Sequence, residues 1–220
     1  MVRVFATAIG DVRDRSLYAD LMPLLTPQKR ERIEKLVHAE DVVRTLTGER
    51  LIRDIIERKF GIQGAAVRLD TNAYGKPFLA GYPDFHFNLS HSGRLVVCAV
   101  GGSPVGIDVE HQGDADWKAI ASFLSDEEQR DLSARPAEDQ RSHFYRLWTL
   151  KESCLKCRGK GFFIDPASFT IKIEDRGICL STGSGAIDLR YCFKTYDLDR
   201  GYSLAACSEG ESFAAGVARV

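Results

Sequence analysis

Hydrophobic residues in the first half of the chain are spaced as one strand, two helices and then several strands. The apolar run at residues 1–5 predicts a strand. Thr26 followed by Pro27 predicts a helix to about residue 37, because threonine caps helix N-termini and proline fits the first helical position. Apolar residues recur at helical spacing from about 41 to 60, and Gly61 is placed to end that second helix.

Shorter stretches complete this half. Strands are predicted near residues 65–70, 85–90 and 95–100. The segment 72–77, Asn-Ala-Tyr-Gly-Lys-Pro, is expected to form an irregular turn, since glycine and proline interrupt regular structure. The Gly-Gly-Ser-Pro sequence at 101–104 then marks a midpoint of the chain.

The second half repeats this order. It contains a strand at 104–110, helices within 115–132 and 137–158, and strands near 168–173, 177–181, 189–196 and 202–208. Strand, helices and strands, twice over, predict an α+β fold of two similar α/β halves in a pseudo-twofold arrangement. We expect these halves to be residues 1–103 and 104–220, with an active site in the cleft between them.

Composition and charge narrow the functional classes. The chain is 44% hydrophobic and 28% charged with a net charge of −1, so it offers no global field for nucleic acid or an anionic membrane. Its uncharged stretch at 95–107 is shorter than the about 20 apolar residues of a spanning helix, and no signal-peptide core follows the first strand. We therefore expect a cytoplasmic protein whose six cysteines, including the C-x-x-C pair Cys154 and Cys157, are reduced and structural.

The strand at 104–110 carries the first candidate chemistry. A period of two sends Gly106, Asp108 and Glu110 to one face and the apolar residues between them to the other. Two carboxylates at this spacing repel each other, but they suit Mg²⁺, which takes one or two carboxylates together with substrate phosphate oxygens. The alternative is an ordinary half-buried strand with a solvated polar face.

A third carboxylate lies on the helix 137–158. Glu152 and Lys156 are four residues apart and share one face of that helix with Trp148. They can form an ordinary surface ion pair of small energetic value. They can equally supply a further metal ligand and a cation that neutralises charge on a leaving phosphate.

Ser90 and His91 suggest two chemistries at the end of the strand 85–90. A serine hydrolase of the common type would need a G-x-S-x-G turn, which the chain lacks. We therefore expect His91 to donate to a phosphate rather than to act as the base for Ser90. Lys29 and Arg32, three residues apart on the first helix, can also point together at a phosphate, although such basic runs are usually solvated.

Three segments, taken in this order, resemble the Sfp (surfactin) type of 4'-phosphopantetheinyl transferase. They are Phe-Asn-Leu-Ser-His-Ser-Gly at 87–93, Gly-Ile-Asp-Val-Glu at 106–110 and Trp-Thr-Leu-Lys-Glu-Ser-Cys-Leu-Lys at 148–156. Shorter matches occur at 26–30, 38–41, 44–46, 74–77 and 158–161. The resemblance covers about residues 1–210, nearly the whole chain.

This resemblance implies that coenzyme A and Mg²⁺, or Mn²⁺, bind between two halves of a monomer. The enzyme would transfer the 4'-phosphopantetheine arm to a serine of an apo acyl, aryl or peptidyl carrier protein and release adenosine 3',5'-bisphosphate. By motif, Asp108, Glu110 and Glu152 would hold the metal, with Glu152 as the base and Lys156 on the phosphates. The coenzyme A contacts would be Lys29, Arg32, Arg44, Thr45, Tyr74, Gly75, Lys76, Pro77, Ser90 and His91.

Other interpretations remain open at this point. A Mg²⁺-dependent phosphohydrolase or nucleotidase would use the same carboxylates, with water as acceptor and no partner protein. A non-catalytic coenzyme A binding module would have lost one of the carboxylates. The segment 112–124, with Trp117 and Phe123, either docks the carrier protein or belongs to the core of the second half.

Overall fold

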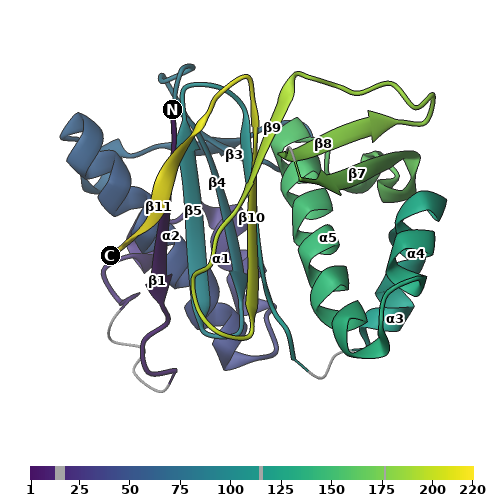
Figure 1. Cartoon of the computed structure of the whole chain (residues 1–220). Helices are drawn as coiled ribbons and strands as arrows, with labels where there is room; N and C mark the ends of the chain where they lie inside the picture. The colour runs from purple at the N-terminus through teal and green to yellow at the C-terminus, as the bar shows by residue number, and fades with distance from the viewer. Residues whose placement is uncertain (13–17, 114–115, 176) are drawn as a thin grey trace.

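Two β-sheets packed against each other form the centre of the computed structural model, with helices on both outer faces (Figure 1). The structure describes residues 1–12, 18–113, 116–175 and 177–220. The first half contains β1 (Val2–Ala8), α1 (Pro27–Glu34), α2 (Ala39–Phe60), β2 (Leu69–Thr71), β3 (Pro77–Leu79), β4 (His86–Ser92) and β5 (Leu95–Gly101). The second contains β6 (Val105–His111), α3 (Trp117–Ile120), α4 (Asp126–Ser133), α5 (Ala137–Arg158), β7 (Phe169–Glu174), β8 (Gly177–Thr182), β9 (Tyr191–Thr195), β10 (Tyr202–Glu209) and β11 (Phe213–Arg219).

Four layers result from this packing. The first sheet has the strand order β11-β1-β5-β4, and α1 and α2 cover its outer face around Ile52 and Ile56. The second sheet, β6-β10-β9, is covered by α5 around Phe144 and Leu150. The facing surfaces of the two sheets meet in a third core of small and β-branched side chains, which includes Val2, Val4, Ala6, Val97, Val105, Ile107, Val109 and Ala206.

Most elements predicted from the sequence are confirmed, together with the α+β class and the repeated order of strand, helices and strands. Thr26 caps α1 by accepting a hydrogen bond from the Lys29 N–H at 3.3 Å, and Gly61 ends α2 with φ of 70°. The first helix is shorter than predicted and ends at Glu34. The helical region expected within 115–132 is divided into α3 and α4, because Ser125 starts a new helix with its own capping box.

Two strands were not predicted. β3 begins at Pro77, the last residue of the expected turn 72–77, and pairs with β2. β11 pairs in parallel with β1, so the end of the chain belongs to the sheet of the N-terminal half. The boundary between residues 103 and 104 stays a prediction.

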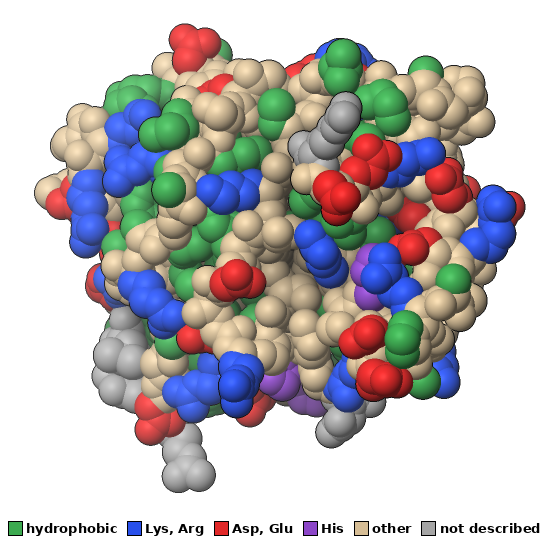
Figure 2. Space-filling model, viewed as in Figure 1, with side chains coloured by type: hydrophobic (Ala, Val, Ile, Leu, Met, Phe, Trp, Pro, Cys, Tyr) green, Lys and Arg blue, Asp and Glu red, His purple; other side chains and the backbone are tan. Residues whose placement is uncertain are grey.

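The surface in view carries acidic and basic side chains interspersed with one another, in keeping with the net charge of −1 (Figure 2). Among the described residues, no helix has both the length and the apolar character needed to cross a bilayer. All six cysteines are free thiols. Cys154 and Cys157 of α5 and Cys207 of β10 are buried in the core between this helix and the second sheet.

Alternate side chains of β4 join the two sheets at the free edge of β6. Asn88 Oδ1 accepts from the Ile107 N–H at 2.9 Å, Ser90 Oγ from the Val109 N–H at 3.4 Å, and Ser92 Oγ from the His111 N–H at 3.0 Å. The side chains on β4 and the N–H groups on β6 both recur at every second residue. This match arises because side chains on one face of a strand and N–H groups along one edge of a strand each have a period of two. Small polar side chains here take the place of a neighbouring strand's backbone.

Gly106 lets α5 lie directly on β6. A Cβ atom at this position would overlap the Ser153 carbonyl oxygen and the Cys157 nitrogen, both of which belong to the helix backbone. The polar face of β6 predicted from the sequence is therefore confirmed, but it faces α5 rather than solvent. Asp108, two residues further on, is consequently only 2% exposed.

Replacing Gly106 with alanine tests this contact. The added methyl group must push α5 away from β6, and overpacking of this kind costs about 1–3 kcal/mol of the free energy of unfolding. Thermal unfolding should show a Tm lower by about 2–4 °C for each kcal/mol lost. Gly216→Ala is the matched control, because a Cβ there meets nothing within 4 Å; equal melting temperatures for both variants would refute the close contact.

Candidate active site

A lysine, an aspartate and a serine from three different elements form the centre of the site. Lys156 on α5 donates from Nζ to Asp108 Oδ1 on β6 at 2.5 Å and to Ser90 Oγ on β4 at 3.0 Å. Ser90 Oγ donates to the same Asp108 oxygen at 2.9 Å. The structure thus brings together three residues that the sequence assigned to one site from separate motifs.

Two further carboxylates flank this cluster. Ser92 Oγ donates to Glu110 Oε2 at 3.0 Å, and Glu152 lies one helical turn before Lys156 on α5. Two buried oxygens, Asp108 Oδ2 and Glu152 Oε1, have no hydrogen-bond partner among the described residues. Buried oxygens without a partner are costly, so their presence points to a ligand that supplies one.

Burial and mutual repulsion shift the protonation of these groups. Burial raises the pKa of Glu152 to about 7, with Lys156 opposing the shift and Asp108 adding to it. Burial also raises the pKa of Glu110 to about 7, again with a contribution from Asp108. For Lys156, burial acts in the opposite direction, but the surrounding carboxylates, Asp108 first, outweigh it and raise its pKa. The cluster holds more potential negative charge than one lysine can compensate.

The donor set fits a divalent cation, although the ligands are not gathered into a closed cage. Among the described residues, no three acidic, histidine or cysteine side chains already lie close enough together to hold a metal ion. Lys156 takes one oxygen of Asp108, whereas the unpartnered oxygens of Asp108 and Glu152 are hard ligands of the kind that Mg²⁺ prefers. The role of Asp108, Glu110 and Glu152 as metal ligands stays a prediction.

A cationic edge lies beside the cluster. Partial burial of the ring, together with the positive charges of Arg44 and Lys156, lowers the pKa of His91, so these three groups are close in space. Arg44 donates from Nη1 to the Gly93 carbonyl at 3.2 Å, which ties α2 to the turn after β4. The Thr45 hydroxyl is used within α2, where it donates to a carbonyl one turn earlier at 2.8 Å.

Lys29 and Arg32 are placed differently. Lys29 Nζ donates to Glu49 on α2, and Glu49, only 2% exposed, also accepts from Arg53 Nε at 2.6 Å. Lys29 therefore fixes α1 on α2 in this structure, while Arg32 is exposed on α1. Their predicted role on a phosphate is not tested by these contacts.

The turn at 72–77 crosses to the second half through Lys76. Lys76 Nζ donates to the carbonyl oxygens of Val105 at 2.8 Å and Lys156 at 2.7 Å, and so covers the C-terminal end of α5. Gly75 has φ of 84°, which few other residues adopt, and Tyr74 is 48% exposed. Pro77 follows as the first residue of β3. The Lys76 side chain thus ties this turn to the helix that carries Glu152 and Lys156.

The segment 112–124 divides between core and surface. Leu124 is 1% exposed and belongs to the core beneath α5, and the Trp117 ring lies 5.4 Å from that of Phe144. Phe123 is 49% exposed. Residues 114 and 115 lie outside the described residues. Part of this segment is therefore core, and Phe123 is the aromatic residue that it presents to solvent.

A groove of about 570 Å³ lies between α5 and strands β9 and β10. Arg146 and Thr149 of α5, Thr195 of β9 and Ser203 of β10 are among the residues that line it. None of the site residues predicted from the sequence lines this groove. We therefore do not count it as part of the candidate site.

Sequence reasoning missed two residues that shape the site. Ser92 holds Glu110, and Asn88 holds the start of β6. Their signal was the alternation of small polar side chains at 88, 90 and 92 with the apolar Phe87 and Leu89. Such a row is unexpected on a buried strand unless it satisfies polar groups of a neighbour.

Comparisons with known proteins show the family of the chain. The chain matches the model of the 4'-phosphopantetheinyl transferase superfamily over residues 104–207, and that of the 4'-phosphopantetheinyl transferase N-terminal region over residues 14–102. It is 37% identical over 214 residues to a 4'-phosphopantetheinyl transferase of Bacillus subtilis, covering 94% of each chain. It is also 37% identical over 197 residues to 4'-phosphopantetheinyl transferase Sfp of Bacillus subtilis strain 168, covering 87% of this chain and 85% of that one.

A solved structure, the holo-[acyl-carrier-protein] synthase of Thermotoga maritima, overlaps 50% of this chain and 64% of its own, with 20% identity and a TM-score of 0.40. The matched family models and the full-length relatives define the class of protein, a group-transfer enzyme. On the strength of the full-length relatives, the chain belongs to the Sfp-type 4'-phosphopantetheinyl transferases.

The raised carboxyl pKa values predict how stability depends on pH in metal-free buffer. Glu110 and Glu152 have a pKa of about 7 in the folded chain against 4.5 as the ordinary value. Between these two pH values the folded state therefore binds more protons than the unfolded state does. The stability contributed by the protonated groups is fully present below pH 4.5 and is lost as the pH rises through about 7. Glu110→Gln should accordingly raise the Tm relative to wild type at pH 8 and have little effect at pH 5.

Thermal unfolding in EDTA at both pH values measures this effect. Glu34→Gln, at the exposed end of α1, is the control and should leave the Tm unchanged at both. A Glu110→Gln effect of equal size at pH 5 and pH 8 would contradict the assigned burial cost.

Proposed function

We propose that this chain transfers the 4'-phosphopantetheine arm of coenzyme A to a serine of apo acyl, aryl or peptidyl carrier proteins, with Mg²⁺ or Mn²⁺ held by Asp108, Glu110 and Glu152. The observation that carries the proposal is the pair of buried oxygens without a partner on Asp108 and Glu152, beside the cation of Lys156. The family to which the chain belongs supports the same reaction.

The chain's own residues account for the proton and the charge in this reaction. The carrier serine oxygen attacks the phosphorus that bears the pantetheine arm, and the bond to the bridging oxygen of the diphosphate breaks. Glu152 takes the serine proton as the general base. Lys156 compensates negative charge on the departing adenosine 3',5'-bisphosphate. A bound Mg²⁺ ion would supply neutralisation of the diphosphate charge.

Coenzyme A would lie between the two halves of one chain. Arg44 and His91 of the first half lie close to Lys156, so their N–H groups are placed to donate to the phosphates, and Ser90 lies beside Lys156 and Asp108. The turn Tyr74, Gly75, Lys76 and Pro77 would flank the adenine through its backbone, with Thr45, Lys29 and Arg32 completing the contacts. Every residue of the proposed site belongs to one copy of the chain, so we infer that a monomer can carry out the transfer. We also infer that it works in the cytoplasm.

Intact-mass analysis of apo carrier proteins after incubation with enzyme, coenzyme A and Mg²⁺ tests the transfer. Carriers of the fatty-acid, polyketide and nonribosomal-peptide classes should be compared, and at least one should gain the mass of the phosphopantetheine arm. If coenzyme A is instead consumed without a carrier and with water as acceptor, the chain is a phosphohydrolase. If it binds coenzyme A with no turnover of either kind, it is a binding module.

Asp108→Ala is expected to remove most of the transfer activity. The change deletes one carboxylate of the proposed metal site and leaves Lys156 without its closest partner. The double change Glu31→Ala and Lys35→Ala, which removes an exposed ion pair at the end of α1, is the control and should retain full activity. Turnover at the wild-type rate in Asp108→Ala would refute the metal assignment.

Coenzyme A should bind more tightly than its 3'-dephospho form. Charge-assisted hydrogen bonds from Arg44 and His91 are worth about 1.5–3 kcal/mol each when shielded from water, or roughly 10- to 150-fold in Kd. Calorimetry with both ligands measures the difference, and Arg44→Ala should reduce it. Arg58→Ala, near the far end of α2, serves as the control. Equal affinity of the wild-type enzyme for the two ligands would contradict the role of these cations.

A further inference from the structure

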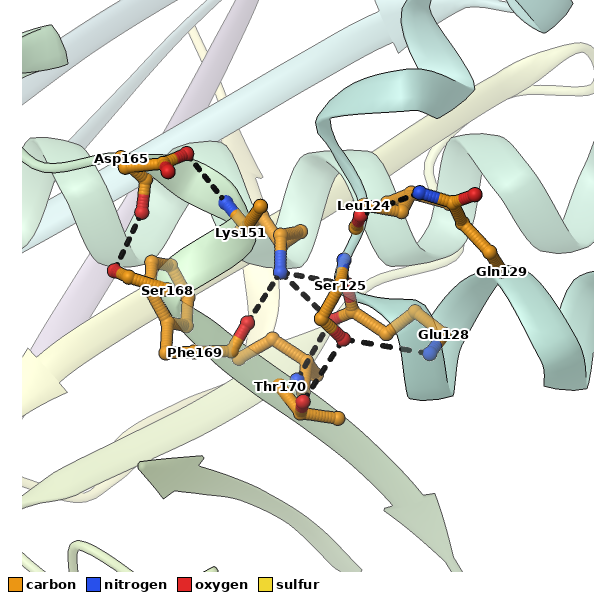
Figure 3. A network of polar contacts seen from close by, with 11 residues as sticks. Leu124, Ser125, Glu128, Gln129, Lys151, Asp165, Ser168, Phe169 and Thr170 are labelled. Carbon is orange, nitrogen blue, oxygen red and sulfur yellow. Dashed lines mark hydrogen bonds and ion pairs between the residues drawn. The ribbon is translucent and has the colours of Figure 1, made fainter. Parts of the chain in front are cut away.

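Lys151, the neighbour of Glu152 on α5, is completely buried and fully hydrogen-bonded. Its side chain is 0% exposed. Its Nζ donates to Glu128 Oε1 at 2.9 Å, to Glu128 Oε2 at 2.6 Å and to the Phe169 carbonyl at 2.7 Å (Figure 3). The three donors of the ammonium group therefore have three acceptors, and the ammonium also lies 4.4 Å from the centre of the Phe169 ring.

Glu128 connects this lysine to two other elements. Its Oε1 accepts from the Ile171 N–H of β7 at 2.7 Å, and its Oε2 accepts from the Ser125 N–H at 2.8 Å (Figure 3). Ser125 in turn caps α4 and shares a hydrogen bond of 2.8 Å with the Thr170 hydroxyl. One buried ion pair thus fixes α5, α4 and β7 to one another.

Stability alone is a weak explanation for such a pair. Removing two charges from water is expensive, and apolar side chains of similar volume often stabilise a core as well as a buried ion pair does. An ion pair in which every donor is satisfied fixes the orientation of the elements that carry it, because all of its bonds can form in only one arrangement.

Lys151 lies on the side of α5 that is opposite to its contact with β6. Successive residues of a helix are about 100° apart, so Lys151 and Ser153 lie about 200° apart around the axis, with Glu152 between them. Ser153 is on the side where the helix backbone meets β6 at Gly106. The contact with Gly106 sets the distance of α5 from the sheet, and the bonds of Lys151 on the other side set its rotation.

We propose that Lys151, clamped by Glu128, is a positioning residue that sets the rotation of α5 and so aims Glu152 and Lys156 at Asp108. A carboxylate about 5–6 Å from a helix axis moves by about 1 Å when the helix turns by roughly 10°. Displacements of about 1 Å can cost on the order of 100-fold in catalytic rate. This inference rests on the proposed transferase function.

The double variant Lys151→Met with Glu128→Gln tests the proposal. It removes both charges while keeping side chains of similar length, so the fold should persist. The Tm should fall by a few degrees, because glutamine has one acceptor oxygen and leaves either the Ile171 or the Ser125 N–H without a partner. The kcat should fall by about 100-fold, whereas the KM for coenzyme A and its calorimetric affinity in EDTA should change by less than about threefold, since all of the proposed coenzyme A contacts except Lys156 lie in the other half.

Lys172→Met is the matched control. Lys172 pairs with Glu127 at 2.9 Å and joins the same two elements, β7 and α4, but at the surface. It should leave the Tm, the kcat and the KM unchanged. If the double variant does not fold, Lys151→Met alone, which leaves both Glu128 oxygens bonded to the backbone N–H groups of Ile171 and Ser125, is measured in the same way.

The outcomes separate positioning from general support. A folded variant with wild-type kcat overturns the proposal, and so does one in which the Tm, the coenzyme A affinity and the kcat all fall together. A selective loss of kcat supports it. If the wild-type enzyme itself modifies no carrier protein, the proposed function has failed, and that result is visible before any variant is made.

Discussion

The site exists because β6 satisfies its free edge with side chains rather than with another strand. Asn88, Ser90 and Ser92 accept the N–H groups along that edge, and two of these side chains, Ser90 and Ser92, also donate to Asp108 and Glu110. The same hydroxyl groups therefore join the two sheets and orient the carboxylates. Larger side chains at 90 or 92 would separate the sheets, and apolar ones would leave backbone donors buried without acceptors.

Two lysines five positions apart on α5 illustrate the difference between structural and chemical use of a charge. Lys151 has all its donors occupied and is shielded from water, so its place is fixed. The Lys156 side chain is 28% exposed and uses two acceptors among the described residues, which leaves a third donor for a phosphate oxygen. The neighbouring carboxylates keep it charged. A reactive site needs a donor that is not already bonded within the protein. The fully bonded Lys151 nearby holds the helix in place while Lys156 keeps that donor available.

Much of the site was predictable because its order follows local rules. The period of two along 104–110 correctly placed Gly106, Asp108 and Glu110 on one face, and the spacing of Glu152 and Lys156 placed both on one side of α5. The partners of other residues depend on tertiary packing, which local pattern does not encode. Lys29 pairs with Glu49, 20 positions away on another helix. β11 escaped prediction because only Phe213 and Val217 break a run of small residues, and its partner is at the other end of the chain.

The pairing of β11 with β1 has a consequence for the order of folding. Val2 pairs with Phe213 and Ala6 with Arg219, so the outer strand of the sheet that contains β1 is supplied by a segment that follows all the other described strands in sequence. Until then β1 presents an open edge, which is the feature of a nascent sheet most prone to wrong association. Closing it requires a loop that spans nearly all of the described residues, and contacts of such high sequence separation form late. The sheet that contains β1 is therefore completed only after β11, which follows every other described strand, has been made.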